Sequence, residues 1–376
     1  MTAIELPARA GTDLTAPSVM ARVRVYAAGL PDSAPEIERT GRIPGAVLDG
    51  LKATGLLRAA LPPALGGVEM TVPELTRAVD LLAEGDASVA WCAAVALNAA
   101  LAQVSLPADV VTELFPEPDL ITATVLPPTG RAVRRGGGHL LTGRWTHASG
   151  ITHADRVMAG FLTPDGTPAI AVFDAAHVRV LDTWHTTGLR GTGSHDFEVA
   201  DLFVPDRHTF RLMPSGTRRE PLHLRADNLA LKMAGVPLGI GRAALKAARE
   251  ILSARRAALP RPGVPADLAH AESLIGAADA YVYATLEKAW AAQAAGLTPE
   301  RGTAALARRF AHRACREAVQ LLYDAVGTAA VYTEHTPLDR CLRDLITASR
   351  HVASSEKILD GVGDLRLGGD PASPHL

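Results

Sequence analysis

The spacing of apolar and polar positions divides the chain into three parts. In residues 17–114 apolar positions recur at helical spacing, whereas in 120–204 they form short β-branched or alternating runs between Gly and Pro turns. From about residue 227 the helical period returns and continues almost to the end. This order predicts an α+β fold with an N-terminal helical domain (1–118), a middle β domain (119–210) and a C-terminal helical domain (211–376).

One helix of the first part is expected to be buried. Residues 88–104 are almost entirely small and apolar, and a helix that is apolar all round lies in a protein interior. Trp91, Cys92 and Asn98 are its exceptions. Each of them either packs with its hydrogen bonds satisfied or points into a pocket, and the sequence leaves both alternatives open. A pocket lined by this helix would suit an uncharged organic substrate.

The middle part predicts a compact antiparallel barrel or sandwich. Strands are expected at 156–162 and 168–173, with Pro-Asp-Gly at 164–166 as the hairpin turn between them. Segment 139–150 is another strand that ends in a polar turn, and segment 182–205 contains three closely spaced glycines. Glycines in such a turn indicate that a ligand or another backbone approaches closely.

The last part predicts a helical bundle. Long segments with helical periodicity are separated by short loops, and such helices pack against one another. The expected helices span 238–252, 268–295, 304–325 and 338–359. The alanine-rich helices carry more apolar surface than one bundle can hide, and this excess predicts a homotetramer.

Composition narrows the class of protein. The 376 residues include 38 Lys and Arg against 40 Asp and Glu, so the formal net charge is −2, with no block of one sign. We therefore expect no nucleic-acid or membrane-surface partner. The three cysteines are far apart, which predicts a reducing, cytoplasmic setting without disulfides. No apolar run approaches the roughly 20 residues of a membrane helix.

Several common catalytic sites are absent from the sequence. The histidines and cysteines show no metal-ligand spacing, and no phosphate-binding Lys-Ser/Thr follows a glycine loop. Segment 235–241 resembles a dinucleotide fingerprint only superficially, because no strand precedes it. Ser149, His153 and Asp155 could be imagined as a hydrolytic triad, but the Gly-x-Ser-x-Gly nucleophile turn is missing.

Two motifs in the β part carry a resemblance to a known family. W-x-x-x-S-G occupies 145–150, and D-T-W-H-x-x-G-L-R-G-T-G-S-x-D occupies 182–196. Together with the helical motifs around 58–67 and 86–91, they resemble the acyl-CoA dehydrogenase superfamily, and more specifically its two-component flavin-dependent monooxygenase branch. The resemblance extends over nearly the whole chain. It implies an N-terminal helical domain, a middle antiparallel β domain and a C-terminal four-helix bundle, with a flavin between the last two.

The matched positions suggest how a flavin would be held. An isoalloxazine needs a flat apolar wall and hydrogen-bond partners for its pyrimidine edge and N5. Thr122 and Thr124 would supply the edge partners, Trp145 the wall, and Ser149 a bond to N5 or to an oxygen adduct at C4a. A core aromatic and an exposed turn hydroxyl are the alternatives for Trp145 and Ser149.

The C-terminal motif suggests the chemistry. Residues 337–344 resemble P-x-x-R-x-x-R-D, which in acyl-CoA dehydrogenases is commonly followed by Tyr-Glu-Gly-Thr with a catalytic Glu. Here the corresponding residues are 351–354, His-Val-Ala-Ser. His351 is therefore the candidate base, with a solvated helix histidine as the alternative. Trp91 and Asn98 would bind substrate, although many hydroxylases of this branch carry a histidine near Asn98.

These expectations define one principal hypothesis and two alternatives. The principal one is an oxygenase that takes reduced flavin from a separate reductase, because no NAD(P)H motif is present, and uses O2 on a small organic substrate. Gly-Thr at 327–328, where FAD-dependent dehydrogenases have Gly-Gly, favours FMN over FAD. An acyl-CoA dehydrogenase or oxidase acting on a thioester is the first alternative. A non-catalytic scaffold or ligand carrier is the second.

Overall fold

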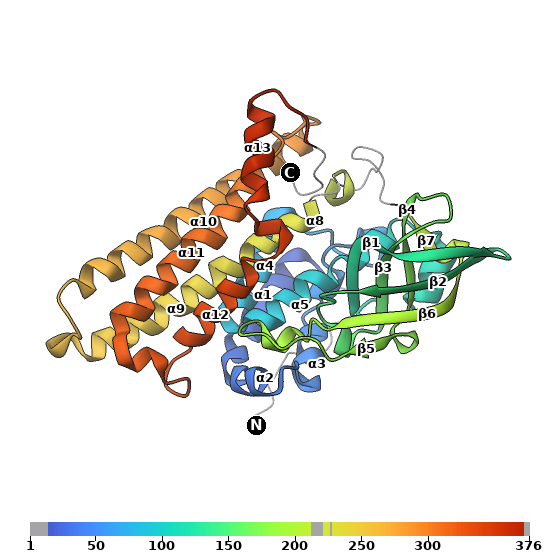
Figure 1. Ribbon diagram of the computed structural model, residues 1–376. Helices are drawn as coiled ribbons and strands as arrows, with labels where there is room; N and C mark the ends of the chain where they lie inside the picture. The colour runs from blue at the N-terminus through green and yellow to red at the C-terminus, as the bar shows by residue number, and fades with distance from the viewer. Residues whose placement is uncertain (1–13, 212–220, 226–227, 372–376) are drawn as a thin grey trace.

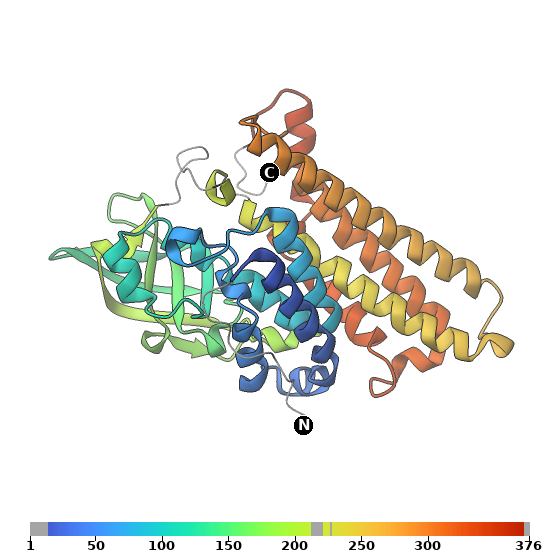
Figure 2. The same cartoon turned by 180° about the vertical axis from the view of Figure 1, so that it is seen from behind.

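The computed structural model describes residues 14–211, 221–225 and 228–371. A helical bundle and a β domain lie at opposite ends, and the N-terminal helices lie between them in both views (Figure 1, Figure 2). The helices are α1 Ala16–Gly29, α2 Ala34–Thr40, α3 Gly45–Ala53, α4 Val72–Gly85, α5 Ala87–Ala96, α6 Ala99–Gln103, α7 Ala108–Leu114, α8 Asn228–Leu231, α9 Gly235–Ala254, α10 Val264–Ala294, α11 Thr303–Val326, α12 Leu338–Ala348 and α13 Lys357–Arg366. The strands are β1 Thr122–Arg135, β2 Gly138–Trp145, β3 Arg156–Leu162, β4 Pro168–Asp174, β5 Arg179–Leu181, β6 Asp196–Pro205 and β7 Thr209–Phe210.

The buried helix predicted over 88–104 is present but divided. Asp86 caps α5 by accepting hydrogen bonds from the N–H groups of Ser88 and Val89. α5 ends at Ala96 and α6 begins at Ala99, because the Asn98 N–H bonds the carbonyl three residues back, that of Val95, instead of four back. The break places Asn98 at the junction of two short helices.

The described strands form one sheet in the order β5-β6-β2-β1-β3-β4-β7. Every neighbouring pair is antiparallel except β1 and β3, which run parallel, so the expectation of a purely antiparallel β domain is corrected at this pair. Ala123 and Val125 of β1 point into the β-domain core. Because side chains alternate along a strand, Thr122 and Thr124 lie on the opposite face.

The C-terminal bundle consists of α9, α10, α11 and α12. α9 also packs against α4 of the N-terminal domain at a very short spacing. A Cβ added at Gly235 or Gly239 would come within 2.4 or 2.2 Å of α4 carbonyl oxygens. The glycines of segment 235–241 therefore permit close packing of two helices, and the segment is not a nucleotide-binding loop.

The helix predicted over 338–359 is interrupted. α12 ends at Ala348, a short 3₁₀ turn covers Val352–Ser354, and α13 starts at Lys357. His351 lies at the start of that turn and not within a helix. The interruption turns this residue back toward the N-terminal domain.

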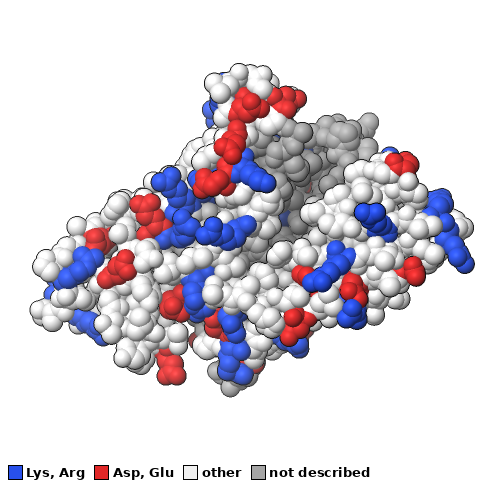
Figure 3. All heavy atoms as spheres, viewed as in Figure 1, with Lys and Arg blue, Asp and Glu red and all other residues white. Residues whose placement is uncertain are grey.

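Charged side chains of both signs are mixed over the visible face of the molecule (Figure 3). Lys and Arg side chains are interspersed with Asp and Glu over the bundle and the β domain on the face shown in Figure 3. None of the helices in the described part of the chain combines the length and the apolar character needed to cross a membrane.

Candidate active site

Three of the residues singled out from the sequence meet where the N-terminal, β and C-terminal parts converge. The indole N–H of Trp91, on α5, donates to Ser149 Oγ at 3.0 Å. The same indole contacts the imidazole of His351 edge to face, with ring centroids 5.2 Å apart and planes at 82°. Residues widely separated in sequence thus form one cluster.

Ser149 belongs to a chain of buried hydroxyl groups. Its Oγ lies 2.7 Å from Ser194 Oγ, which in turn lies 2.6 Å from Thr192 Oγ1. Thr192 Oγ1 donates to the carbonyl of Leu189 at 2.8 Å. Sequence reasoning singled out the Gly-rich turn that contains Thr192 and Ser194, but it did not identify these two hydroxyls as part of the site.

His351 is held by its own turn and by α11. Its Nδ1 accepts a hydrogen bond from the Ala353 N–H at 3.2 Å, and the buried Arg308 donates from Nε to the Ala353 carbonyl at 2.6 Å. A backbone N–H can only donate, so Nδ1 carries no proton in this arrangement, and the neutral ring carries its proton on Nε2. His351 therefore presents a hydrogen-bond donor at Nε2.

A second histidine lies beneath this turn. His312 is buried one helical turn after Arg308 on α11. Burial, together with the nearby Arg308 and His351, lowers the pKa of His312 to about 3. His312 is therefore neutral at physiological pH and adds no charge near His351.

Thr122 and Thr124 provide the clearest opening for a ligand. Both Oγ1 atoms are buried, and neither has a hydrogen-bond partner among the described residues. Leaving a buried hydroxyl unpaired costs about 1–3 kcal/mol. Two such hydroxyls on one face of β1 fit the polar edge of a bound flavin, which would pair with both of them.

Trp145 does not lie at a ligand surface. Its ring is fully buried, stacks on Phe197 with centroids 5.0 Å apart, and donates its N–H to the Gly160 carbonyl at 2.7 Å. An added Cβ at Gly130 or Gly143 would clash with the ring. The expectation that Trp145 forms the flavin wall is therefore corrected: both neighbouring glycines and Phe197 enclose it in the β-domain core.

Asn98 is half-buried and pairs with a lysine that the sequence did not suggest. Lys232, in the turn before α9, donates from Nζ to Asn98 Oδ1 at 2.9 Å and also bonds the Leu229 carbonyl. Because Oδ1 accepts from the lysine, the amide nitrogen of Asn98 faces the other way as a donor. Burial lowers the pKa of Lys232 to about 7, and no described carboxylate pairs with it.

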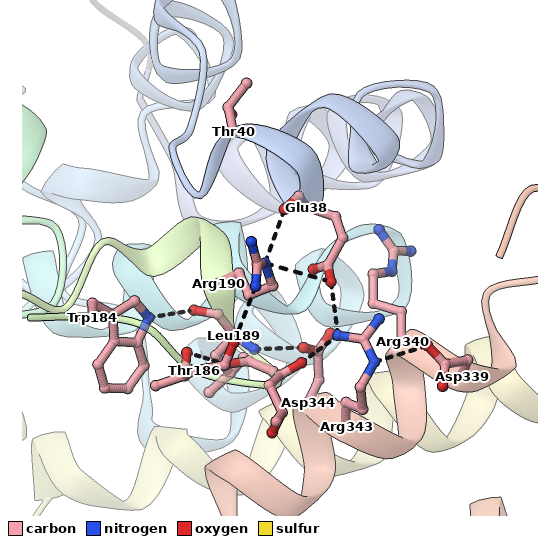
Figure 4. Close-up of polar contacts among 12 residues, drawn as sticks. Glu38, Thr40, Trp184, Thr186, Leu189, Arg190, Asp339, Arg340, Arg343 and Asp344 are labelled. Carbon is pink, nitrogen blue, oxygen red and sulfur yellow. Dashed lines mark hydrogen bonds and ion pairs between the residues drawn. The ribbon is translucent and has the colours of Figure 1, made fainter.

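The P-x-x-R-x-x-R-D motif anchors the glycine-rich turn (Figure 4). Asp344 Oδ1 accepts the Leu189 N–H at 2.6 Å, and Arg343 Nη1 lies 2.7 Å from Glu38 Oε1 on α2. Leu189 has a left-handed backbone with φ of 51°, and Gly188 lies so close to Arg343 that a Cβ would fall 2.2 Å from its carbonyl oxygen. The motif thus positions the turn that carries Thr192 and Ser194.

The alternative chemistries find no support in the geometry. Ser149 bonds Trp91 and Ser194 instead of His153, so the imagined triad is not assembled. The carboxylate nearest to His351 in sequence, Glu356, is 80% exposed and pairs with Arg309. The described residues contain no group of three or more potential metal ligands.

Comparisons with known proteins agree with this arrangement. Residues 19–106 match the family described as "Acyl-CoA dehydrogenase, N-terminal domain", and residues 231–356 match "Acyl-CoA dehydrogenase, C-terminal domain". The chain is 30% identical to indole-3-acetate monooxygenase of Pseudomonas putida, covering 91% of each chain. It is 25% identical to the oxygenase component of p-hydroxyphenylacetate 3-hydroxylase of Acinetobacter baumannii, covering 90% of this chain and 86% of that one.

A solved structure shows the same fold. XiaF from Streptomyces, in complex with FADH2 and glycerol, superposes with a TM-score of 0.81 at 26% identity, covering 96% of this chain and 98% of XiaF. The predicted α+β architecture and the predicted reaction class are both confirmed. The chain belongs to the two-component flavin-dependent monooxygenases of the acyl-CoA dehydrogenase superfamily, as an oxygenase component that depends on a flavin.

Proposed function

We propose that this oxygenase binds reduced FMN beside β1 and the turn of Ser149, and uses O2 to oxygenate an aromatic substrate that carries a carboxylate. Bound reduced flavin would supply the electrons that activate O2. The observation that carries the location is the pair of orphaned hydroxyls on β1. This strand packs against α5, the helix that carries Trp91.

Each side chain has a distinct role in this proposal. Thr122 and Thr124 pair with the polar edge of the flavin, and Ser149 faces N5. The ring of His351, with its proton on Nε2, lies against Trp91 and would stabilise negative charge on oxygen or substrate. Trp91 positions Ser149 and His351 through its N–H and its ring, and Asn98 directs its amide donor to the substrate.

The preference for FMN is supported by the end of α11. Gly327 is the C-cap of this helix, with φ of 68°, and Thr328 follows it where a second glycine would be needed to admit a pyrophosphate. FMN has a single phosphate and does not need that cradle. A separate reductase would deliver the reduced cofactor, and the oxygenase components among the relatives support this part of the proposal.

The substrate class is supported by Lys232 and by the relatives. The names of two relatives specify arylacetates, namely indole-3-acetate and p-hydroxyphenylacetate. Lys232 is a buried amine beside Asn98 without a carboxylate partner among the described residues, and a substrate carboxylate would favour its charged form. A charged substrate is a proposal that differs from the expectation of an uncharged one. We expect indole-3-acetate to bind at least tenfold more tightly than its neutral amide, a difference of about 1.4 kcal/mol.

A pair of isosteric substitutions tests the flavin site. Thr122→Val and Thr124→Val each remove an orphaned hydroxyl, so each should raise the free energy of unfolding of the flavin-free protein by about 1–3 kcal/mol. The same variants should bind reduced FMN roughly 2- to 12-fold more weakly, because a hydrogen bond is lost. Thr40→Val, at an exposed site on α2, is the matched control. Unchanged FMN affinity in both β1 variants would place the flavin elsewhere.

Assembly into a homotetramer, in the cytoplasm, is also part of the proposal. Large apolar side chains are exposed on the C-terminal bundle and its connections. They include Tyr281, Val331, Tyr332, Ile346 and Leu359. Exposed apolar side chains of this kind support a subunit interface. Light scattering at micromolar concentration tests it, and a monomer would contradict it.

A further inference from the structure

The hydroxyl chain of the active site has a defined direction. The Leu189 carbonyl has no proton, so the 2.8 Å contact with Thr192 Oγ1 requires the threonine to donate. Thr192 then has only lone pairs for Ser194, so Ser194 donates to Thr192 across their 2.6 Å contact. Ser194 has used its single proton, and Ser149 must donate to it across 2.7 Å. Each proton in the chain points toward Leu189.

The direction of the hydroxyl chain determines whether Ser149 can donate a hydrogen bond to a ligand or only accept one. Its hydroxyl proton is directed to Ser194, and one lone pair receives the indole N–H of Trp91. A hydroxyl has one donor and two acceptor positions, so only an acceptor position remains. Ser149 therefore accepts a hydrogen bond from a ligand but has no proton to give it.

We propose that Thr192 and Ser194 are positioning residues that make Ser149 an obligate acceptor, and that the site thereby discriminates reduced from oxidised flavin. Reduced flavin carries a hydrogen on N5 and donates, whereas oxidised flavin has a bare N5 that accepts. As an acceptor facing N5, Ser149 forms a hydrogen bond with the reduced flavin. With the oxidised flavin, a lone pair of Ser149 faces the lone pair of N5 and no hydrogen bond forms. The inference rests on the proposed placement of N5 beside Ser149.

The same turn explains why the direction is fixed. The Leu189 carbonyl also accepts the indole N–H of Trp184 at 3.0 Å, and Leu189 itself is held by Asp344 (Figure 4). The carbonyl at the end of the hydroxyl chain is therefore held in place by neighbouring hydrogen bonds. All three hydroxyls are buried, so bulk water does not compete for their protons.

Affinities for the two flavin states provide a test that does not depend on turnover. Dissociation constants for reduced and oxidised FMN are measured by anaerobic titration of the full chain. Leaving a buried polar atom unpaired raises a dissociation constant by about 5- to 140-fold. The wild-type protein should therefore bind reduced FMN more tightly than oxidised FMN by a factor in this range. Ser194→Ala releases the Ser149 proton, which can then turn toward a bare N5. Its affinity for oxidised FMN should rise and the preference should fall toward one.

Three further variants separate this role from simple damage. Thr192→Val removes the acceptor for Ser194, and it should also reduce the preference; it serves as the test if Ser194→Ala does not fold. Thr192→Ser keeps the hydroxyl and should retain the wild-type preference. Thr186→Val lies in the same turn but outside the chain, since its hydroxyl bonds the Gly188 carbonyl, and it should also retain the preference.

The outcomes distinguish this inference from the proposed function. A folded Ser194→Ala or Thr192→Val variant with the wild-type ratio, or with equal weakening of both flavin states, would overturn the directional role of the chain. Equal wild-type affinity for the two states would also overturn it while leaving the flavin site intact. Wild-type protein that binds neither state would contradict the proposed function itself.

Discussion

Trp91 and Ser149 lie 58 positions apart in sequence and are joined by a 3.0 Å hydrogen bond from the indole N–H to the serine hydroxyl. Both side chains are buried. The bond connects a helix of the N-terminal domain to a turn of the β domain, and the same indole contacts His351 from the C-terminal part. The relative placement of the three parts therefore determines the geometry of the active site.

Trp91→Phe should separate the hydrogen bond from the ring contact. Phenylalanine keeps an aromatic ring against His351 but cannot donate to Ser149, so the free energy of unfolding should fall by about 0.5–1.5 kcal/mol beyond the effect of the smaller ring. Trp290→Phe, at a half-buried tryptophan whose N–H has no partner among the described residues, is the control. If Trp91→Phe and Trp290→Phe lower the free energy of unfolding equally in denaturant titrations, the hydrogen bond from Trp91 to Ser149 contributes nothing to stability.

Substitutions of His351 should reveal which chemistry the ring performs. His351→Ala should lower turnover by about 10²–10⁴-fold, the usual contribution of a proton-transfer or donor group. His351→Asn keeps an acceptor for the Ala353 N–H but loses the Nε2 donor, so it should be equally impaired. His351→Gln supplies an N–H near the Nε2 position and should recover part of the activity.

A general base would give another pattern. Glutamine cannot accept a proton, so a His351→Gln variant as inactive as His351→Ala would indicate proton removal by the ring instead of donation. An alanine variant that keeps more than about a tenth of wild-type turnover would exclude both roles.

Asp344 should make stability depend on pH. Burial raises the pKa of Asp344 from its ordinary value to about 7, although the Leu189 N–H and Arg340 favour the ionised form. A raised pKa in the folded state stabilises the fold at low pH, and this contribution is lost as the pH rises through about 7. Asp344→Asn still accepts the Leu189 N–H at every pH. Between about pH 4 and pH 7 the wild-type urea midpoint should therefore fall relative to this variant and then level off, and parallel pH profiles over this range would contradict the assignment.

Lys232 should show the opposite dependence. Burial lowers the pKa of Lys232 to about 7 in the folded state. Above about pH 10.5 the amine is neutral in both the folded and the unfolded state, and it does not reduce the free energy of unfolding. As the pH falls from about 10.5 toward 7, the amine becomes charged mainly in the unfolded state, so the free energy of unfolding decreases. Lys232→Met removes this penalty and should be more stable than wild type by about 2–4 kcal/mol near neutral pH, after allowance for the lost hydrogen bonds. It should also lose the preference for indole-3-acetate over the amide. A variant less stable at neutral pH than at pH 10, relative to wild type, would contradict this account.

The sequence predicted the fold because its patterns are local. The turn at 164–166 and the short runs on either side of it predicted strands at 156–162 and 168–173, which match β3 and β4, and the motifs at 145–150 and 182–196 indicated the superfamily. The sequence could not place Trp145, because the pattern along β2 puts Trp145 on the same face as Leu141 but does not indicate whether that face meets a ligand or the β-domain core. Nor did helical periodicity reveal the interruption before His351, which depends on Arg308 binding the Ala353 carbonyl.

The missed site residues depend on long-range contacts. Lys232 lies 134 positions from Asn98, and nothing in its own segment indicates that its amine is buried beside an amide. Thr192 and Ser194 lie in a turn that was recognised, but their roles follow from the path of that turn around the Leu189 carbonyl. Hydrogen-bond direction is a property of the folded chain and has no signature in composition or spacing.

Rapid mixing of the anaerobic complex of this protein and reduced FMN with oxygenated buffer tests the central claim most directly. If the chain is an oxygenase component that controls the reaction of reduced flavin with O2, a transient absorbance distinct from both reduced and oxidised FMN should appear and then decay. Its lifetime should shorten in Ser149→Ala, with release of hydrogen peroxide. Oxidation of FMN at the rate seen in buffer alone, without any transient, would contradict the account.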